Sequence, residues 1–182
     1  MIINWYGGGC YKVAAAGFDL VVDPQSSDSG SRLKADLLVR TAVPFPLDNV
    51  ASGEIIGPGE YEMSGVVVRG APAAENGPKE LRTIYKVLID DITLGFIGNS
   101  SGELSEKALD MLGEIDILFV PSNAMGAKFI KQVGPKVAVP GWGDPIKVAG
   151  DIGQKPEAQE KLVIKKKDIE AMDGLKVVIL ES

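Results

Sequence analysis

Short stretches of alternating or continuous apolar residues, separated by glycine and proline, fill the N-terminal half of the chain. They cover residues 2–6, 11–15, 18–23 and 35–41, and Pro24 ends the third stretch. Such runs between turn residues are typical of strands, so we predict an opening β-meander. Residues 25–34 are polar and predict a surface loop. Residues 41–53 predict a second loop, because two prolines preclude a long helix there.

The middle of the chain predicts two strand pairs followed by a helix. Residues 54–72 contain a Pro-Gly turn, and residues 83–98 are interrupted at Asp90-Asp91, which suits a tight hairpin. Ser105 is the expected N-cap of the following helix and Gly113 its end. Apolar residues recur there at helical spacing, at Leu104, Ala108, Leu109 and Leu112.

The C-terminal third predicts a strand, a helix and a strand in succession, at residues 115–121, 123–133 and 136–140. This βαβ order implies a parallel strand pair. Residues 141–160 predict a loop-rich segment with a turn at 143–145, and residues 161–167 and 175–181 predict a terminal strand pair. The expected architecture is one domain, residues 1–182, of α/β or α+β class, with mixed sheets covered by helices.

The composition is that of a soluble globular protein with an excess of acidic residues. A formal net charge of -6 and a pI near 4.8 oppose a broad phosphate-binding surface, so we expect no nucleic acid partner. The only basic run, Lys165 to Lys167, is typical of an edge strand protected against pairing with other chains. We expect no secretory leader, because the first residues have neither a basic nor an apolar region, and the sequence lacks an apolar stretch of the roughly 20 residues that cross a bilayer. We therefore expect a cytoplasmic protein that does not bind membranes.

The chain has no histidine and a single cysteine, Cys10. The absence of histidine removes the commonest ligand of zinc, copper and iron, and also the usual general base near neutral pH. One cysteine excludes an internal disulfide. Any mechanism that requires an imidazole is therefore excluded.

Several motifs follow one another in a fixed order along the chain. The first are WYGGGCYKV and, one strand later, VVDP; ADLLVRTA, GPGEYEMSGVVVRGAP, TIYKV and IGNSSGELSEKALDMLGEIDILFVP come after them. Together they resemble the small bacterial metallo-β-lactamase-fold hydrolases, which usually open with WYGHSCF and a strand that ends in Asp-Pro. The resemblance covers essentially the whole chain. It implies a four-layer αββα sandwich with two zinc ions bound at one edge, where they activate a water.

The chain departs from this family at its metal ligands. Where the family has four ligands in one loop, an alignment from Ala35-Asp36 gives two prolines, an alanine and a leucine, and Asn99 replaces the bridging aspartate. Residues 73–76 stand in place of a further histidine-bearing loop. With Asp23 of the Asp-Pro motif, the vestigial active-site positions are Gly8, Asp23, Ala42, Pro44, Pro46, Leu47, Asn99 and Trp142. The resemblance therefore implies that the dinuclear centre is lost. We expect no metal, no cofactor and no catalytic residue. Apolar side chains could fill the former cavity, and the sequence leaves open whether the site is filled or remains an open cleft.

Two acidic residues and the cysteine have structural interpretations beside chemical ones. We expect Asp23 to hold loop backbone through hydrogen bonds. Asp48 would bring a carboxylate toward the old site only after a register shift. Cys10 has no histidine to activate it, so we expect a buried core thiol.

The remaining candidates lie in loops. Gly7-Gly8-Gly9 predicts a turn rather than a phosphate cradle, because a strand follows it. Residues 99–101 predict loop and helix-capping contacts rather than an anion site. Trp142, with Tyr6 nearby, is interpreted as a buried aromatic plug, and the alternative is the wall of a small-molecule pocket.

Three functional hypotheses follow. The first is a metal-free pseudoenzyme that acts through its surface as a binding or scaffold protein, with an unknown protein partner or a second copy. The second is a small-ligand binder that uses the old cleft, lined by Trp142, Asn99 and Asp23, without turnover. The third is a divergent hydrolase with an unconventional site built from carboxylates such as Asp23 and Asp48.

Overall fold

A computed structural model describes residues 1–25, 33–46, 53–73 and 79–181. Within these residues, one mixed sheet has six strands in the order β14-β1-β2-β3-β4-β6. Its strands are β1 (Ile2–Trp5), β2 (Tyr11–Ala15), β3 (Phe18–Val22), β4 (Leu37–Val39), β6 (Glu54–Ile55) and β14 (Lys161–Val163). β1, β2 and β3 are antiparallel, which confirms the first three strands of the predicted meander. The fourth is wrong, because β4 joins β3 in parallel.

The second sheet of the described residues has nine strands, in the order β13-β15-β12-β11-β10-β9-β8-β7, with β5 paired to β9. Its strands are β5 (Ala42–Pro44), β7 (Gly59–Met63), β8 (Val66–Pro72), β9 (Glu80–Ile89), β10 (Ile92–Phe96), β11 (Ile117–Ser122), β12 (Val137–Gly143), β13 (Glu157–Gln159) and β15 (Lys176–Leu180). β7 to β10 are antiparallel, and β10, β11, β12 and β15 are parallel.

Two tight turns connect antiparallel strands of this sheet. Asp90 and Asp91 have φ values of 54° and 60°, which confirms the hairpin predicted there. The Pro-Gly turn predicted between the preceding strands is wrong, because β7 and β8 are joined at Ser64-Gly65, where both φ values are positive. Gly59 instead begins β7.

Four helices are described: α1 (Glu106–Leu112), α2 (Gly126–Val133), α3 (Pro145–Asp151) and α4 (Lys166–Glu170). The predicted caps of α1 are confirmed, since Ser105 Oγ accepts from the backbone N–H of Ala108 at 3.2 Å and Gly113 ends the helix. The βαβ unit is confirmed as well, because β11 and β12, which flank α2, are parallel. Gly134 ends α2 in the left-handed conformation.

Four predictions for the loops and the C-terminal region are wrong. The segment 141–160 contains α3, whose N-cap Asp144 accepts from the N–H of Ile146 at 3.1 Å. The terminal strand pair does not form, because β14 pairs with β1 in one sheet and β15 with β12 in the other. The lysine run does not lie in an edge strand, since Lys165 is the N-cap of α4. In the predicted loop 41–53, β5 pairs with β9.

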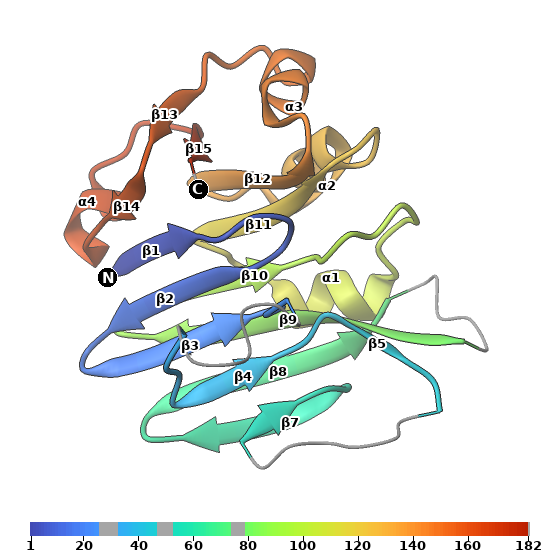
Figure 1. Cartoon of the computed structure of the whole chain (residues 1–182). Coiled ribbons are helices and arrows are strands. Elements are labelled where there is room, and N and C mark those ends of the chain that lie inside the picture. Colours follow the sequence, from blue (N-terminus) through green and yellow to red (C-terminus); the bar gives the residue numbers. More distant parts are fainter. Residues whose placement is uncertain (26–32, 47–52, 74–78, 182) are drawn as a thin grey trace.

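The two sheets face each other and enclose the larger core (Figure 1). Helices α1, α2 and α3 lie on the outer face of the nine-stranded sheet, where Leu112, Phe129 and Ala149 build a second core. This arrangement confirms the predicted sandwich of two mixed sheets flanked by helices. None of the described helices has the length and apolar character needed to cross a bilayer.

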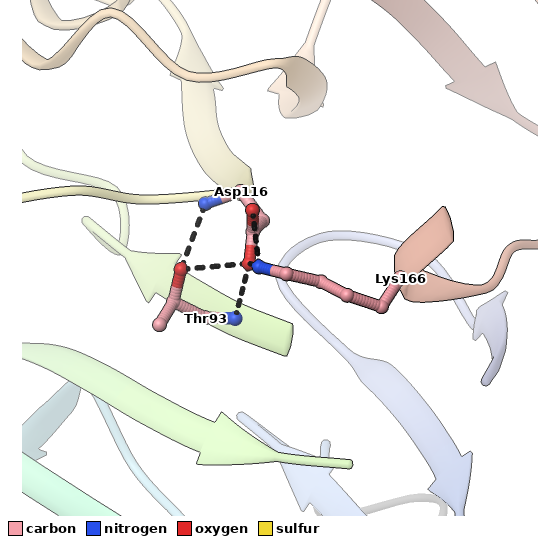
Figure 2. Close-up of polar contacts among 3 residues, drawn as sticks. All are labelled: Thr93, Asp116 and Lys166. Carbon is pink, nitrogen blue, oxygen red and sulfur yellow. Dashed lines mark hydrogen bonds and ion pairs between the residues drawn. The ribbon is translucent and has the colours of Figure 1, made fainter. Parts of the chain in front are cut away.

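A polar cluster outside the cores ties α4 to the nine-stranded sheet (Figure 2). Asp116 Oδ2 accepts from the N–H of Thr93 at 2.8 Å and from its hydroxyl at 3.0 Å, and Lys166 Nζ donates to the same carboxylate at 2.8 and 3.0 Å. Burial raises the pKa of Asp116, but the bonds from Lys166 and Thr93 outweigh it and hold the pKa below its ordinary value. The cluster is therefore charged and fully bonded at neutral pH.

Candidate functional site

An open cleft of about 360 Å³ lies at one edge of the sandwich. It is bordered by the segments that follow β1, β3, β4 and β10, by the first residues of β9 and by the end of β12. Five of the vestigial positions line it: Gly8, Asp23, Ala42, Asn99 and Trp142. The structure thus brings together residues that are up to 134 positions apart, counted from Gly8 to Trp142 (142 − 8).

Asp23 lies at the floor of this cleft, with a positive φ of 46°. Its Oδ1 accepts from the backbone N–H of Thr41 at 2.7 Å, and its Oδ2 accepts from the Thr41 hydroxyl at 2.5 Å. Burial raises the pKa of Asp23 to about 6, against the effect of these two bonds and of the nearby Arg40 charge. Asp23 therefore holds the loop after β4, as its structural interpretation expects.

Trp142 forms one wall of the cleft and is half-buried. Its ring packs directly over Gly9, where a Cβ atom would lie 1.9 Å from Cζ2 of the indole. The backbone N–H of Trp142 donates to the carbonyl of Gly8 at 3.3 Å, and the indole ring meets the ring of Tyr11 edge-on at a centroid distance of 6.3 Å. Trp142 is thus fixed by Gly8, Gly9 and Tyr11. It is partly a buried aromatic plug and partly a wall of the cleft.

Two arginines of the cleft were not identified from the sequence. Arg82 donates from Nε to Glu80 at 2.7 Å and from Nη1 to the carbonyl of Asn99 at 2.6 Å. Arg40 donates from Nε to Glu54 and from Nη1 to the carbonyl of Pro24, the latter at 3.1 Å. The signal for both was their place at strand ends, since Arg40 follows β4 and Arg82 lies near the start of β9. Gln25 and Glu80 also line the cleft.

Several predicted positions do not take part in the cleft. Pro44 and Pro46 are exposed and do not line it, so they do not fill the cleft with apolar volume, and of the two alternatives the structure shows an open cleft. Leu47, Asp48 and residues 74–76 lie outside the described residues. Tyr6 is exposed and does not line the cleft either.

The glycine run and the residues beside it are structural. The N–H of Cys10 donates to the carbonyl of Gly7 at 2.9 Å, which closes the predicted turn. Cys10 itself is fully buried, as expected for a core thiol. Beyond Asn99, the carbonyl of Ser100 accepts from the side-chain amide of Asn123 at 2.9 Å, so this loop is held to the segment between β11 and α2.

The cleft does not fit the pair of zinc ions that the resemblance implies. Among the described residues, no group of three or more His, Cys, Asp or Glu residues is arranged to hold a metal ion. The wall at Ala42 offers a methyl group, and its cross-strand neighbour Arg82 brings a guanidinium, which repels a cation. Both carboxylate oxygens of Asp23 already accept hydrogen bonds from Thr41. The described side chains of the cleft are therefore suited to hydrogen bonds and ion pairs rather than to metal coordination.

Comparisons with known proteins identify the fold. Residues 2–140 match the sequence family described as a beta-lactamase superfamily domain. A metallo-beta-lactamase superfamily protein from Thermotoga maritima superposes with a TM-score of 0.79 at 19% identity, over 99% of this chain and 98% of that one. Igni18, a metallo hydrolase from Ignicoccus hospitalis, gives 0.63 at 13% identity, over 99% and 94%. YhfI from Bacillus subtilis gives 0.62 at 10% identity, over 97% and 90%.

No curated protein sequence matches the chain significantly. The family match nevertheless spans more than half of the chain, and the structural neighbours cover nearly all of it. The chain belongs to the beta-lactamase superfamily and has the metallo-β-lactamase fold.

Proposed function

We propose that this protein is a catalytically inactive member of the superfamily that binds a small polar molecule in the cleft. The observation that carries the proposal is the open cleft itself, whose volume of about 360 Å³ lies within the range of small-molecule sites, roughly 300–1,000 Å³. Its walls combine an aromatic ring, Trp142, with side-chain hydrogen-bonding groups from several strands. Such convergence of a few polar groups around an apolar surface is typical of ligand sites.

The same residues argue against hydrolysis. A water must be activated by a metal ion or by a general base within hydrogen-bond reach. The chain has no histidine, and the acidic residues that line the described cleft are engaged, Asp23 by Thr41 and Glu80 by Arg82. The fold is therefore expected to retain a binding cleft without the groups that turn over a substrate.

Ligand binding is tested by thermal shift with a panel of small polar compounds, followed by calorimetric titration of the compounds that raise Tm. A ligand at 100 times its Kd stabilises the folded state by about 2.7 kcal/mol. Ala42→Trp fills the cleft, whereas Ala158→Trp adds the same ring at an exposed position on β13 that does not line it. We expect stabilisation of the wild type and of Ala158→Trp, and none of Ala42→Trp. A panel without a single stabilising compound would contradict the proposal.

Inactivity is tested separately. The protein purified without chelator is analysed for metals and then assayed for phosphodiesterase and esterase turnover with and without added zinc. We expect no stoichiometric zinc and no turnover above that of Ala42→Trp. Zinc-dependent turnover that Ala42→Trp abolishes would support the divergent hydrolase instead.

A scaffold role with a protein partner or a second copy is the second candidate. Ile2 and Val163 are direct cross-strand neighbours on β1 and β14, and they are 41% and 59% exposed. Paired apolar side chains at a sheet edge favour association. Light scattering coupled to size exclusion tests self-association: a dimer that Val163→Lys dissociates would support this role, and a monomer at all concentrations would count against it.

A further inference from the structure

We infer that the ligand of the cleft carries a compact anionic group, a carboxylate or a phosphate, and that Arg82 together with Arg40 recognises it. The inference rests on the proposed function and names the chemical class of the ligand. The observation behind it is that two guanidinium groups, those of Arg82 and Arg40, line one cleft and are each held there by hydrogen bonds.

Arg82 is held in place before any ligand arrives. Glu80 accepts from its Nε at 2.7 Å and the Asn99 carbonyl accepts from its Nη1 at 2.6 Å, so two points fix the plane of the guanidinium. Its cross-strand neighbour is Ala42, whose methyl group is too small to cover it. Arg82 consequently lines the cleft and keeps 27% of its side chain accessible.

Arg40 approaches the same cleft from the six-stranded sheet. Its anchors are the buried carboxylate of Glu54 and the carbonyl of Pro24. The side chain remains 32% exposed and lines the cleft. A backbone bond from the N–H of Thr83 to the carbonyl of Thr41, 2.8 Å long, joins the residues that follow the two arginines. The two cations thus line one cleft from segments that this backbone hydrogen bond joins, and each is already held by its own anchors.

Fixed guanidinium groups favour oxyanions over other ligands. Arginine presents planar, charged donors that match the geometry of carboxylates and phosphates, and charged hydrogen bonds are stronger than neutral ones. Groups that are already ordered lose little conformational entropy on binding. The net charge of -6 opposes large polyanions, so the site favours a small anion that fits inside the cleft.

The inference is tested by calorimetric titration of the full chain at constant ionic strength. The probes are inorganic phosphate, glycerol phosphate and succinate, with glycerol as the neutral compound and sodium chloride as the salt control. Arg82→Gln removes the charge but keeps an amide, and the matched control is Arg69→Gln, an exposed arginine that does not line the cleft. Circular dichroism checks that each variant is folded, and Arg82→Lys provides a second variant that keeps the charge but loses the planar fork.

We expect an anionic probe to bind the wild type and Arg69→Gln alike, and Arg82→Gln to weaken binding by about tenfold or more. Arg82→Lys should bind with intermediate affinity. The phosphate and succinate titrations show which anion the cleft prefers. Should neutral compounds bind in a manner that Ala42→Trp abolishes and Arg82→Gln leaves unchanged, the inference is overturned while the proposed function stands. Absence of binding by any probe or any compound of the panel overturns both.

Discussion

Asp23→Asn tests the electrostatics of the cleft floor. Burial raises the pKa of the Asp23 carboxyl from its ordinary 3.8 to about 6, although Thr41 donates two hydrogen bonds to it. Asparagine has nearly the same shape and keeps an acceptor for the N–H of Thr41. The substitution therefore removes the charge with little change in packing, which isolates the effect of ionisation on stability.

The direction in which stability changes with pH follows from the pKa values of Asp23 in the folded and unfolded states. Because the pKa is higher in the folded state, the folded protein holds its proton more tightly than the unfolded chain. The contribution of Asp23 to stability is therefore largest below about pH 4, decreases as pH rises to about 6, and is constant above that. A pKa difference of this size corresponds to at most about 3 kcal/mol. Asp23 borders an open cleft, where screening weakens such effects, so we expect about 1–3 kcal/mol.

The Asp23→Asn variant has no carboxyl group to ionise at this position, so its stability does not show this decrease with rising pH. Relative to the wild type, its free energy of unfolding should rise by about 1–3 kcal/mol between pH 4 and pH 7. The measurement is urea unfolding followed by circular dichroism at pH 4, 5, 6 and 7. Asp151→Asn, at an exposed position that ends α3, is the control, and its difference from the wild type should vary by less than about 0.5 kcal/mol. A stability difference for Asp23→Asn that is constant across this range would refute the raised pKa, and one that falls with pH would refute its sign.

Three further substitutions test the fold. Asp116→Ala leaves the N–H of Thr93 without its acceptor and should cost about 1–3 kcal/mol in urea unfolding; a cost near zero would show that α4 is not held by this cluster. Gly9→Ala brings a Cβ within 1.9 Å of the Trp142 ring, so we expect a loss of about 1–3 kcal/mol and a shifted tryptophan emission, and an unchanged spectrum would count against this packing. Ser105→Ala removes the cap of α1, which should cost about 1 kcal/mol in thermal unfolding, and an unchanged Tm would count against this cap.

The elements that were predicted correctly are those whose turn or capping residues lie within a few positions of one another in the sequence. Asp90-Asp91 tolerate the positive φ that a tight hairpin requires, and Ser105 and Gly113 mark both ends of α1. The order of strand, helix and strand around α2 implied a parallel pair because a short crossover allows little else. In each case local chemistry and tertiary structure agree.

The elements that were missed depend on context that the local sequence does not contain. Asp144-Pro145 begins a helix here, but the same dipeptide is equally suited to a turn, because proline lacks the N–H that neither structure needs at that position. The strand partners of β14 and β15 are chosen by the packing of the two sheets. Their apolar patterns could not distinguish a hairpin from strands in separate sheets.

The sequence predicted which segments meet at the cleft but not the chemistry of its walls. The resemblance predicted Ala42, Asn99 and Trp142 at one site, and the structure brings these three residues together at one cleft. The resemblance could not reveal that Arg82 lines the cleft, nor that Pro44, two residues after Ala42, is exposed and does not line it. Both outcomes depend on how β5 pairs with β9, where Ala42 lies opposite Arg82.

The polar and charged lining of the cleft contributes little to the stability of the fold, which bears on why the cleft is open. A fold without metal ions could close such a cleft with apolar side chains, and well-packed apolar residues often stabilise a protein more than ion pairs do. This chain keeps two arginines at the cleft, and partly exposed ion pairs such as Arg82 with Glu80 contribute only about 0–1 kcal/mol. The raised pKa of Asp23 means that its charge destabilises the fold at neutral pH. Sites that sacrifice stability in this way are typical of binding sites, because the groups that bind a ligand are arranged for the ligand rather than for the empty fold.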